Sequence, residues 1–464
     1  MGIFTKTKFQ GGYKFKNFEG AAKPVLHEMP VPEKIDIPLS DIFSDTFVLA
    51  VREGDTLRAG DRIIKSNNDS KVSLISPVNG TVSKVNSDRI IIASDGSSNI
   101  NPLNGHKENP WHLDRSEVFD IFCETGCSLL CSNQFTSVSD CDKIKYIIIN
   151  AVHNSPLNQS WMPDIIGNSV IFSHGLRTVN ALFPEAETVI AINNRNRKYF
   201  DAPEIKEHAK IKIMSDRYPQ EHPELLSRDT VNRGLVSTDG ESDDSILIMH
   251  FSDVVHIAEV MTQGRPLVDR ILMIAGPGVS EPGWYRVRIG TTLEEIKKQL
   301  LKSDINSPWR IIRGNPLLGE GLQSLDTSIL PSDSEISVIR EHATRELFSF
   351  MRPGFAADSY TKFTVAELIP LFTKKLETNL HGGVRPCVQC NYCDQVCPVD
   401  IYPFLIWKHV KVNEIEESFR FRPYKCIECG LCDYVCPSKI DILQSVINAK
   451  DEYRKLRSAD ELSD

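Results

Sequence analysis

The chain has 464 residues, of which 41% are hydrophobic and 25% are charged, so it is neither a disordered nor a fibrous protein. Its formal net charge is −9 and it has no tract rich in Lys and Arg, and we therefore expect no nucleic-acid binding. No apolar run reaches the roughly 18 residues of a membrane-spanning helix, and no apolar stretch typical of a signal peptide follows Met1.

Residues 1–110 are predicted to form a small β domain with an extended lead-in. Short strands begin at about Ile37 and are divided by turns such as Gly54-Asp55 and Gly60-Asp61. With the hairpin Pro77-Val78-Asn79-Gly80, this pattern resembles a barrel-sandwich hybrid, the shape of biotinyl and lipoyl carriers. Carriers have a modified lysine at the hairpin tip, and this hairpin has none. We therefore expect a structural or docking module.

Residues 111–262 alternate between helical and strand-like segments, which predicts an α/β domain. The apolar runs Tyr146–Asn150 and Thr188–Ile192 are typical of buried strands, and Val254–Thr262 is typical of a short helix. No P-loop is present, and the Gly-rich turn at Gly276-Pro277-Gly278 lacks G-x-G-x-x-G spacing. The sequence therefore predicts no nucleotide-binding motif.

Residues 263–345 are predicted to form a compact unit of strands and one helix. The expected strands are Arg270–Ala275, Trp284–Ile289, Trp309–Ile312 and Glu335–Arg340, and the expected helix is Thr292–Ser303. Residues 346–464 then form a linker and a helical domain, which contains the most informative motif in the chain.

Eight of the twelve cysteines lie in two runs near the C-terminus. The runs are Cys387-x2-Cys390-x2-Cys393-x3-Cys397-Pro398 and Cys426-x2-Cys429-x2-Cys432-x3-Cys436-Pro437. Both have the spacing of bacterial ferredoxins that hold two [4Fe–4S] clusters. A disulfide framework is not expected, because the rest of the chain is poor in cysteine and no secretion signal is visible.

The repeated spacing predicts crossed ligation. Three thiolates spaced in this way can surround one face of a cubane cluster, and the proline turns the fourth cysteine towards the other cluster. The predicted ligands are Cys387, Cys390, Cys393 and Cys436 for the first cluster, and Cys426, Cys429, Cys432 and Cys397 for the second. The alternative is a pair of zinc sites with four ligands each. Zinc would leave the third and the Pro-flanked fourth cysteine of each run unexplained.

Two helices are predicted beside these runs. Ile401–Phe419 is interpreted as one helix between them, and Ile440–Leu456 as an amphipathic helix that packs against the cluster domain. His409, in the first of these helices, is interpreted as a packed or surface residue rather than a ligand.

The other four cysteines, Cys123, Cys127, Cys131 and Cys141, fit no cluster motif. The first three are spaced at i, i+4 and i+8, so they would line one face of a helix. A third metal site is one interpretation. Buried thiols are the interpretation that we favour, because cysteine is among the most buried residue types.

The chain as a whole resembles the A subunit of the sodium-translocating NADH:quinone oxidoreductase (Nqr) and its relative, the C subunit of the Rnf electron-transport complex. The resemblance rests on Gly54–Val82, Tyr146–Pro156, Asp269–Pro277, Arg313–Gly319, Val338–Glu341, Glu346–Phe348, Arg352–Gly354 and Val435–Lys439. Paired cysteine runs are a feature of the Rnf C subunit, whereas the A subunit of the best-known sodium pumps lacks them. The resemblance therefore implies a form of these subunits with two ferredoxin-type clusters.

The same resemblance implies the fold class and the ligands. The expected fold is α+β and multidomain, with an N-terminal barrel-sandwich hybrid, an α/β middle, a β-grasp (SLBB-like) unit and a C-terminal helical domain with two clusters. The Rnf C subunit holds FMN, which faces NADH, on a loop of G-x-G-G-A-G-F type. At the corresponding place, Glu124–Cys131, this chain has Gly126 as its only glycine, which argues against FMN and NADH binding. Quinone is a further candidate ligand.

The main hypothesis is a peripheral subunit on the cytoplasmic face of the cell membrane. It would relay electrons through two [4Fe–4S] clusters in an ion-translocating NADH:quinone or ferredoxin-linked oxidoreductase, with integral-membrane partner subunits and a soluble electron donor. One alternative is an Rnf-type C subunit that acts as an FMN-containing NADH/ferredoxin oxidoreductase. The other is a docking subunit whose clusters are purely structural.

Overall fold

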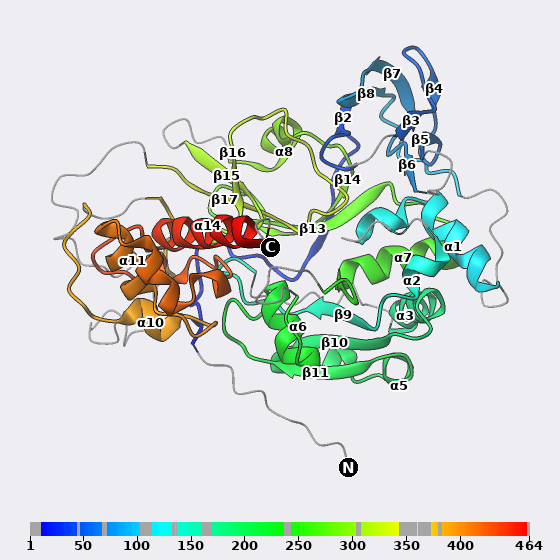
Figure 1. Cartoon of the computed structure of the whole chain (residues 1–464). Coiled ribbons are helices and arrows are strands. Elements are labelled where there is room, and N and C mark those ends of the chain that lie inside the picture. The colour runs from blue at the N-terminus through cyan, green and yellow to red at the C-terminus, as the bar shows by residue number, and fades with distance from the viewer. Residues whose placement is uncertain are drawn as a thin grey trace.

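The computed structural model describes most of the chain. The described residues are 11–43, 47–66, 72–102, 113–131, 135, 137–158, 169–235, 243–302, 308–342, 360, 373–378 and 383–461. Two of the segments that support the resemblance, 346–348 and 352–354, lie outside them. The described residues form two small β-sheets, a parallel sheet, a mixed sheet and a helical C-terminal part (Figure 1).

The two small sheets make up the N-terminal module. Their strand orders are β2-β8-β7-β4 and β3-β5-β6, and aliphatic side chains of both sheets share one buried core. The strands are β2 (Lys34–Pro38), β3 (Phe47–Leu49), β4 (Thr56–Leu57), β5 (Arg62–Ser66), β6 (Ser73–Ile75), β7 (Gly80–Val85) and β8 (Arg89–Ser94). At the hairpin tip Val78 is buried, and Asn79 Oδ1 accepts a 3.0 Å hydrogen bond from the Ala59 N–H. The tip is thus anchored inside the module, unlike the exposed tip of a carrier.

Residues 11–24, here called the N-terminal strap, do not pack on this module. Instead they cross to the other sheets and the C-terminal part, where the Gly12 N–H donates to the Val396 carbonyl oxygen at 2.8 Å and Tyr13 forms an antiparallel bridge with Tyr218. The next segment, β1 (Leu26–Glu28), adds a parallel strand to the edge of the mixed sheet. The lead-in therefore connects parts of the molecule that lie far apart in sequence.

The parallel sheet has the strand order β11-β10-β9-β12. Its strands are β9 (Tyr146–Ala151), β10 (Glu187–Asn193), β11 (Lys210–Met214) and β12 (Ile246–His250). Strands β9, β10 and β12 are largely apolar because helices cover both faces, whereas the edge strand β11 alternates lysine with apolar residues. One face packs on α1 (Arg115–Glu124), α3 (Ser169–Leu182) and α7 (Phe251–Gln263), and the other on α6 (Pro223–Val231). The two predicted strands and the predicted helix of this region are confirmed.

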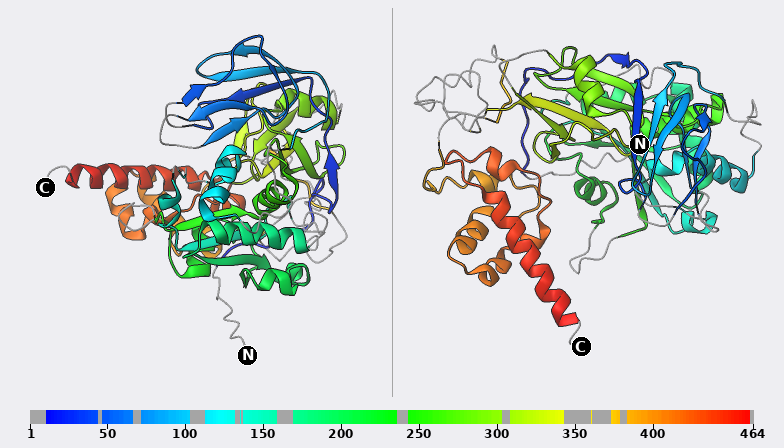
Figure 2. Two further views of the ribbon diagram at one scale, coloured as in Figure 1. Left: turned by 90° about the vertical axis from the view of Figure 1, so that its right-hand side faces the viewer. Right: turned by 90° about the horizontal axis from the view of Figure 1, so that it is seen from above.

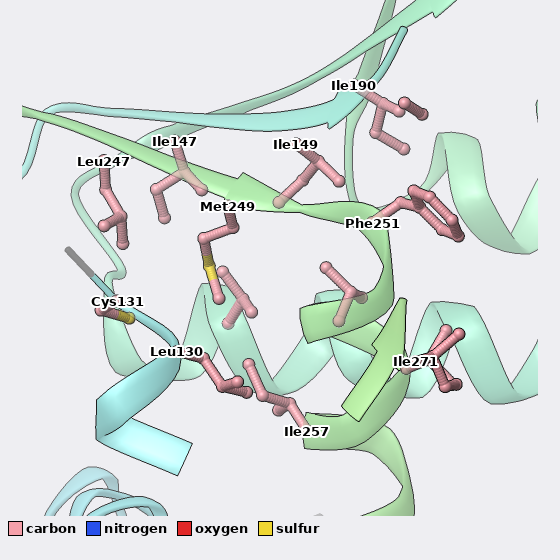
Figure 3. Packing of buried hydrophobic residues seen from close by; sticks show 14 of the residues in the cluster. Leu130, Cys131, Ile147, Ile149, Ile190, Leu247, Met249, Phe251, Ile257 and Ile271 are labelled. Carbon is pink, nitrogen blue, oxygen red and sulfur yellow. The ribbon is translucent and has the colours of Figure 1, made fainter. Parts of the chain in front are cut away.

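Figure 3 shows the core beneath this sheet, where Ile147, Ile149 and Met249 face Leu130 and Ile257. Short helices complete the layer: η2 (Cys127–Leu130), α2 (Val138–Cys141), η4 (Asn194–Asn196), α4 (Arg197–Phe200) and α5 (Pro203–Lys206).

The mixed sheet has the order β1-β14-β13-β17-β15-β16. Its remaining strands are β13 (Asp269–Ala275), β14 (Gly283–Arg288), β15 (Trp309–Arg313), β16 (Glu320–Leu322) and β17 (Glu335–Arg340). Helix α8 (Leu293–Leu300) packs on the sheet through Leu293 and Ile296, and the Thr292 side chain caps its start. The sequence predicted a helix from Thr292 to Ser303, but α8 ends at Leu300, since Leu301 has an extended backbone. Ser303 lies outside the described residues.

The C-terminal part is helical. It contains α10 (Tyr392–Val396), α11 (Pro403–Lys411), α12 (Ile415–Ser418), η6 (Phe419–Phe421), η7 (Pro423–Lys425), α13 (Leu431–Tyr434) and α14 (Ile442–Glu461). The prediction of one helix over Ile401–Phe419 is wrong: α11 ends at Lys411, and Asn413 has φ 61°, a left-handed conformation that ends a helix. Figure 2 shows α14 projecting away from the sheets. No helix in the described part of the chain is long and apolar enough to span a bilayer.

Candidate metal centre

Two loops, residues 387–393 and 426–432, carry the first three cysteines of each run and repeat one backbone conformation. Gln389 and Glu428 both have left-handed φ angles, of 53° and 58°. Their N–H groups turn back to the preceding sulfur atoms, at 3.4 Å for Cys387 Sγ and 3.3 Å for Cys426 Sγ. Such donors favour negative charge on sulfur. The sequence repeat is therefore also a repeat of local structure.

An aspartate after the third cysteine connects each loop to the helix that follows. Asp394 Oδ1 accepts a hydrogen bond from the Phe404 N–H, in the first turn of α11, at 3.2 Å. Asp433 Oδ1 accepts from the N–H groups of Ile442 and Leu443, at the start of α14, at 2.8 and 2.9 Å. These N–H groups have no partner within their helices. The carboxylates therefore cap the helices and fix both loops in position.

The eight cysteines of the two runs surround two adjoining hollows. The first hollow is lined by Cys387, Cys390, Cys393 and Cys436. The second hollow is lined by Cys397, Cys426, Cys429 and Cys432, and Cys393 touches it as well. Each hollow thus brings together three cysteines of one run and the fourth cysteine of the other. Among the described residues, no three Cys, His, Asp or Glu side chains converge as the ligands of one metal ion do.

Burial makes free thiolates unfavourable at both hollows. It raises the pKa of Cys393 to about 12 and that of Cys426 to about 11, and it raises the pKa of Cys432 well above the usual value. Iron or zinc would supply the positive charge that a buried thiolate needs. Thiolate donors around a hollow, with N–H groups directed at sulfur, fit an iron–sulfur cluster.

The two loops differ in their surroundings. In the first loop Val388 is 66% exposed and Cys387 and Cys390 are only partly covered, whereas Cys393 is buried. In the second loop Cys429 is buried, and the Tyr218 hydroxyl donates to its carbonyl oxygen at 2.9 Å. Gly430 lies so close to the mixed-sheet region that a Cβ there would be 2.8 Å from the Leu317 carbonyl oxygen. The second loop therefore faces the body of the molecule and the first loop faces solvent.

The N-terminal strap fills the space between the body and the second loop. Tyr13 and Phe15 both pack edge-on against Tyr434, with ring centroids 5.6 and 5.3 Å apart. Phe15 also contacts Tyr218, with the ring centroids 5.4 Å apart. The strap thus helps to hold the cluster domain against the sheets.

The other four cysteines do not form a cluster site in the described structure. The prediction that Cys123, Cys127 and Cys131 share a helical face is wrong, because α1 ends before Gly126, which has φ 80°. All four cysteines are buried, as expected. Figure 3 shows Cys131 near Leu130 and Leu247. Burial raises the pKa of Cys127 to about 12, so the segment at the place of the flavin loop contributes inert thiols to the core.

Sequence reasoning missed several residues around the second hollow. Tyr218, which contacts Cys429, carries no motif and lies 211 residues away in the chain. Lys450 was also missed, although the repeat offers a signal: Lys450 follows Cys436 at the same interval as Lys411 follows Cys397.

Two family models match the chain. The model of the NqrA N-terminal barrel-sandwich hybrid domain matches residues 12–91, and the model of the 4Fe-4S dicluster domain matches residues 386–440. The second range contains all eight cysteines of the runs. These matches support iron–sulfur binding, and they confirm the expected fold class: mixed α+β, with an N-terminal hybrid domain and a C-terminal ferredoxin-like domain.

Curated relatives match over most of the chain. The A subunit of the Na(+)-translocating NADH-quinone reductase of Yersinia pseudotuberculosis is 24% identical over 367 residues, covering 76% of this chain and 78% of the relative. Its counterpart in Actinobacillus pleuropneumoniae is 26% identical over 389 residues, covering 80% of this chain and 82% of the relative. The chain is similar to these A subunits along most of its length. The resemblance seen in the sequence is thus confirmed, at low identity.

Solved structures give only weak likenesses. Two crystal structures of an NAD+-reducing [NiFe]-hydrogenase, in the air-oxidised and H2-reduced states, match with TM-scores of 0.35 and 0.41 and identities of 12% and 10%. They cover 52% and 75% of this chain, and 52% and 63% of the matched chains. No conclusion follows from scores this low.

Proposed function

We propose that the chain is an electron-transfer subunit of a membrane-bound, sodium-translocating NADH:quinone-type oxidoreductase and that it holds two [4Fe–4S] clusters. The observation that carries this proposal is the pair of adjoining hollows, each lined by three cysteines of one run and the fourth of the other. The similarity to the A subunits of Na(+)-translocating NADH-quinone reductases supports membership of such a complex.

Each hollow would hold one cluster. The first set of ligands is Cys387, Cys390, Cys393 and Cys436, and the second is Cys397, Cys426, Cys429 and Cys432. Bound there, the clusters would supply one-electron transfer. The N–H groups of Gln389 and Glu428 favour negative charge on the sulfurs. A zinc pair is disfavoured, because the model of the 4Fe-4S dicluster domain matches residues 386–440, which contain both runs.

The difference between the two loops suggests how the subunit is arranged. A redox partner would meet the chain at the exposed first loop, since Val388 and its neighbours are open to solvent there. The second loop faces the body through Tyr218 and Leu317, which keep water away from that side. We place the subunit on the cytoplasmic face, attached through integral-membrane partner subunits.

The first experiment is cofactor analysis of the full chain purified without oxygen. Iron, acid-labile sulfide, zinc and flavin are measured together, and an EPR spectrum of the reduced protein is recorded. We expect about eight iron and eight sulfide per chain, no flavin, and the split signal of two neighbouring clusters.

Other results would change the proposal in defined ways. Zinc in place of iron would overturn electron transfer. Bound FMN would favour an Rnf-type flavoenzyme, with NADH then tested as donor. Clusters that no donor can reduce would favour a docking subunit with structural clusters.

A further inference from the structure

A buried lysine lies beside the second loop. Lys450, on α14, is 8% exposed, and its Nζ donates to the Cys426 carbonyl oxygen at 2.7 Å and to Glu428 Oε1 at 2.6 Å. Glu428 directs its own N–H to Cys426 Sγ at 3.3 Å. The ammonium group is therefore fixed, by two short hydrogen bonds, to the segment of chain that wraps the sulfur of Cys426.

The positive charge of Lys450 is only partly offset by its neighbours. The side chain of Glu428 is 42% exposed, against 10% for that of Lys450, so water screens the carboxylate more than the ammonium. His222 also faces this pair. Burial lowers the pKa of His222 to about 4, and Lys450 adds to the shift, so the imidazole is neutral near pH 7. Beside the second hollow, the positive charge is thus screened less by water than the negative charge that pairs with it.

Among the described residues, the first loop has no buried lysine at the matching place in the repeat, although Lys439 and Arg385 lie near Cys436 of the first hollow. Lys411 follows Cys397 at the interval at which Lys450 follows Cys436, and Gln389 stands where the second loop has Glu428. Both Lys411 and Gln389 are exposed. At matching places in the repeat, therefore, Lys450 is buried and hydrogen-bonded to its loop, whereas Lys411 is open to solvent.

A buried charge acts on a nearby redox group much more strongly than a solvated charge, because little water screens it. Reduction adds one negative charge, which the ammonium stabilises, and net charge and solvent exposure are among the properties that set the potential of a cluster. We infer that Lys450, through its charge, raises the reduction potential of the second-hollow cluster and not that of the first. This inference rests on the proposed function.

The test is an EPR-monitored redox titration of the full chain and three variants. We expect Lys450→Met to lower the equilibrium constant for reduction of the second-hollow cluster about tenfold, or about 59 mV for one electron. The midpoint of the first-hollow cluster should not move. Lys450→Arg should restore most of the wild-type potential. Lys411→Met, at the matching place in the repeat, should leave both midpoints in place.

Glu428→Gln provides a test of opposite sign that does not depend on the folding of the lysine variant. It removes the partly compensating carboxylate, so the second-hollow midpoint should rise. Unchanged midpoints in both Lys450→Met and Glu428→Gln, with full iron content, would overturn this inference and leave the proposed function standing. Equal shifts of both clusters would also overturn it. A wild-type chain without iron and sulfide would overturn both.

Discussion

The hydroxyl of Tyr218 donates a 2.9 Å hydrogen bond to the carbonyl oxygen of Cys429, and this contact joins the body of the molecule to the second cysteine loop. Tyr218 is fully buried, and burial raises its pKa well above the usual value, so the phenol stays a neutral donor. Cys429 is buried too. Because both groups are buried, neither can exchange this hydrogen bond for one to bulk water, and the bond therefore stabilises the docked position of the loop.

Tyr218→Phe should loosen the second loop. The change removes the donor and leaves a buried carbonyl oxygen without it, which costs roughly 1–3 kcal/mol. Amide hydrogen exchange in residues 426–432 should speed up accordingly, because local opening becomes easier. The control is Tyr402→Phe, at a side chain that is 45% exposed, where exchange should not change. If amide exchange in residues 426–432 were equally slow in the two variants, the Tyr218–Cys429 hydrogen bond would not hold the second loop in place.

Gly430→Ala should disturb the same interface by a steric route. Gly430 and Gly96 have nearly equal φ angles, of 76° and 77°, so an alanine at either place has a similar left-handed backbone penalty, roughly 1–2 kcal/mol. A Cβ at Gly430 would meet the Leu317 carbonyl oxygen at 2.8 Å, whereas nothing lies within 4 Å of one at Gly96.

The two glycine variants therefore isolate the cost of the contact. Gly430→Ala should lower the unfolding temperature more than Gly96→Ala, and it should lower the iron content as well. Equal losses in the two variants would mean that only the backbone angle matters.

The features that could be predicted from the sequence are those fixed by local pattern. The runs Tyr146–Asn150 and Thr188–Ile192 are largely apolar because helices cover both faces of their sheet. This pattern can be read from the run itself, without knowledge of the helices that pack on it. The cysteine repeat likewise fixes ligand type and spacing within a few residues. Both patterns can therefore be recognised from the sequence alone.

The features that sequence reasoning missed are the ends of helices and contacts between residues far apart in the chain. Two helix ends had a local signal, since Gly126 and Asn413 both adopt left-handed angles and both residue types are common just after a helix. The strap had none, because Tyr13 meets Tyr218 only once the sheets are assembled. The buried ion pair of Lys450 and Glu428 likewise depends on the packing of α14.

Stability should fall as the pH rises from about 4.5 to about 8. Burial raises the pKa of Glu221 to about 8, and the nearby Glu335 adds to the shift, while Arg195 opposes it. A carboxyl group with a raised pKa is protonated in the folded state when the unfolded chain has already lost the proton. Its stabilising effect is complete below the ordinary value of 4.5 and is lost as the pH rises through about 8, at up to about 1.4 kcal/mol per pH unit.

Glu221→Gln should make this dependence shallower, because an amide cannot lose a proton in this range, while Glu335, whose pKa burial raises to about 7, keeps part of the slope. The measurement is the unfolding temperature between pH 5 and pH 8, with Glu204→Gln at an exposed position as the control. The control should fall with pH as the wild type does. A wild-type curve that is level over this range would contradict the predicted shift.

Crossed ligation can be tested by counting iron in paired cysteine variants. If Cys397 and Cys426 serve the same cluster, the double variant Cys397→Ala/Cys426→Ala loses one cluster and keeps about four irons. The pair Cys397→Ala/Cys387→Ala then removes one ligand from each cluster and should leave almost no iron. Uncrossed ligation reverses these two results, because Cys397 and Cys387 would share a cluster. Cys141→Ala, at a buried cysteine outside the runs, should keep about eight irons and shows that loss of a buried thiol alone does not empty the hollows.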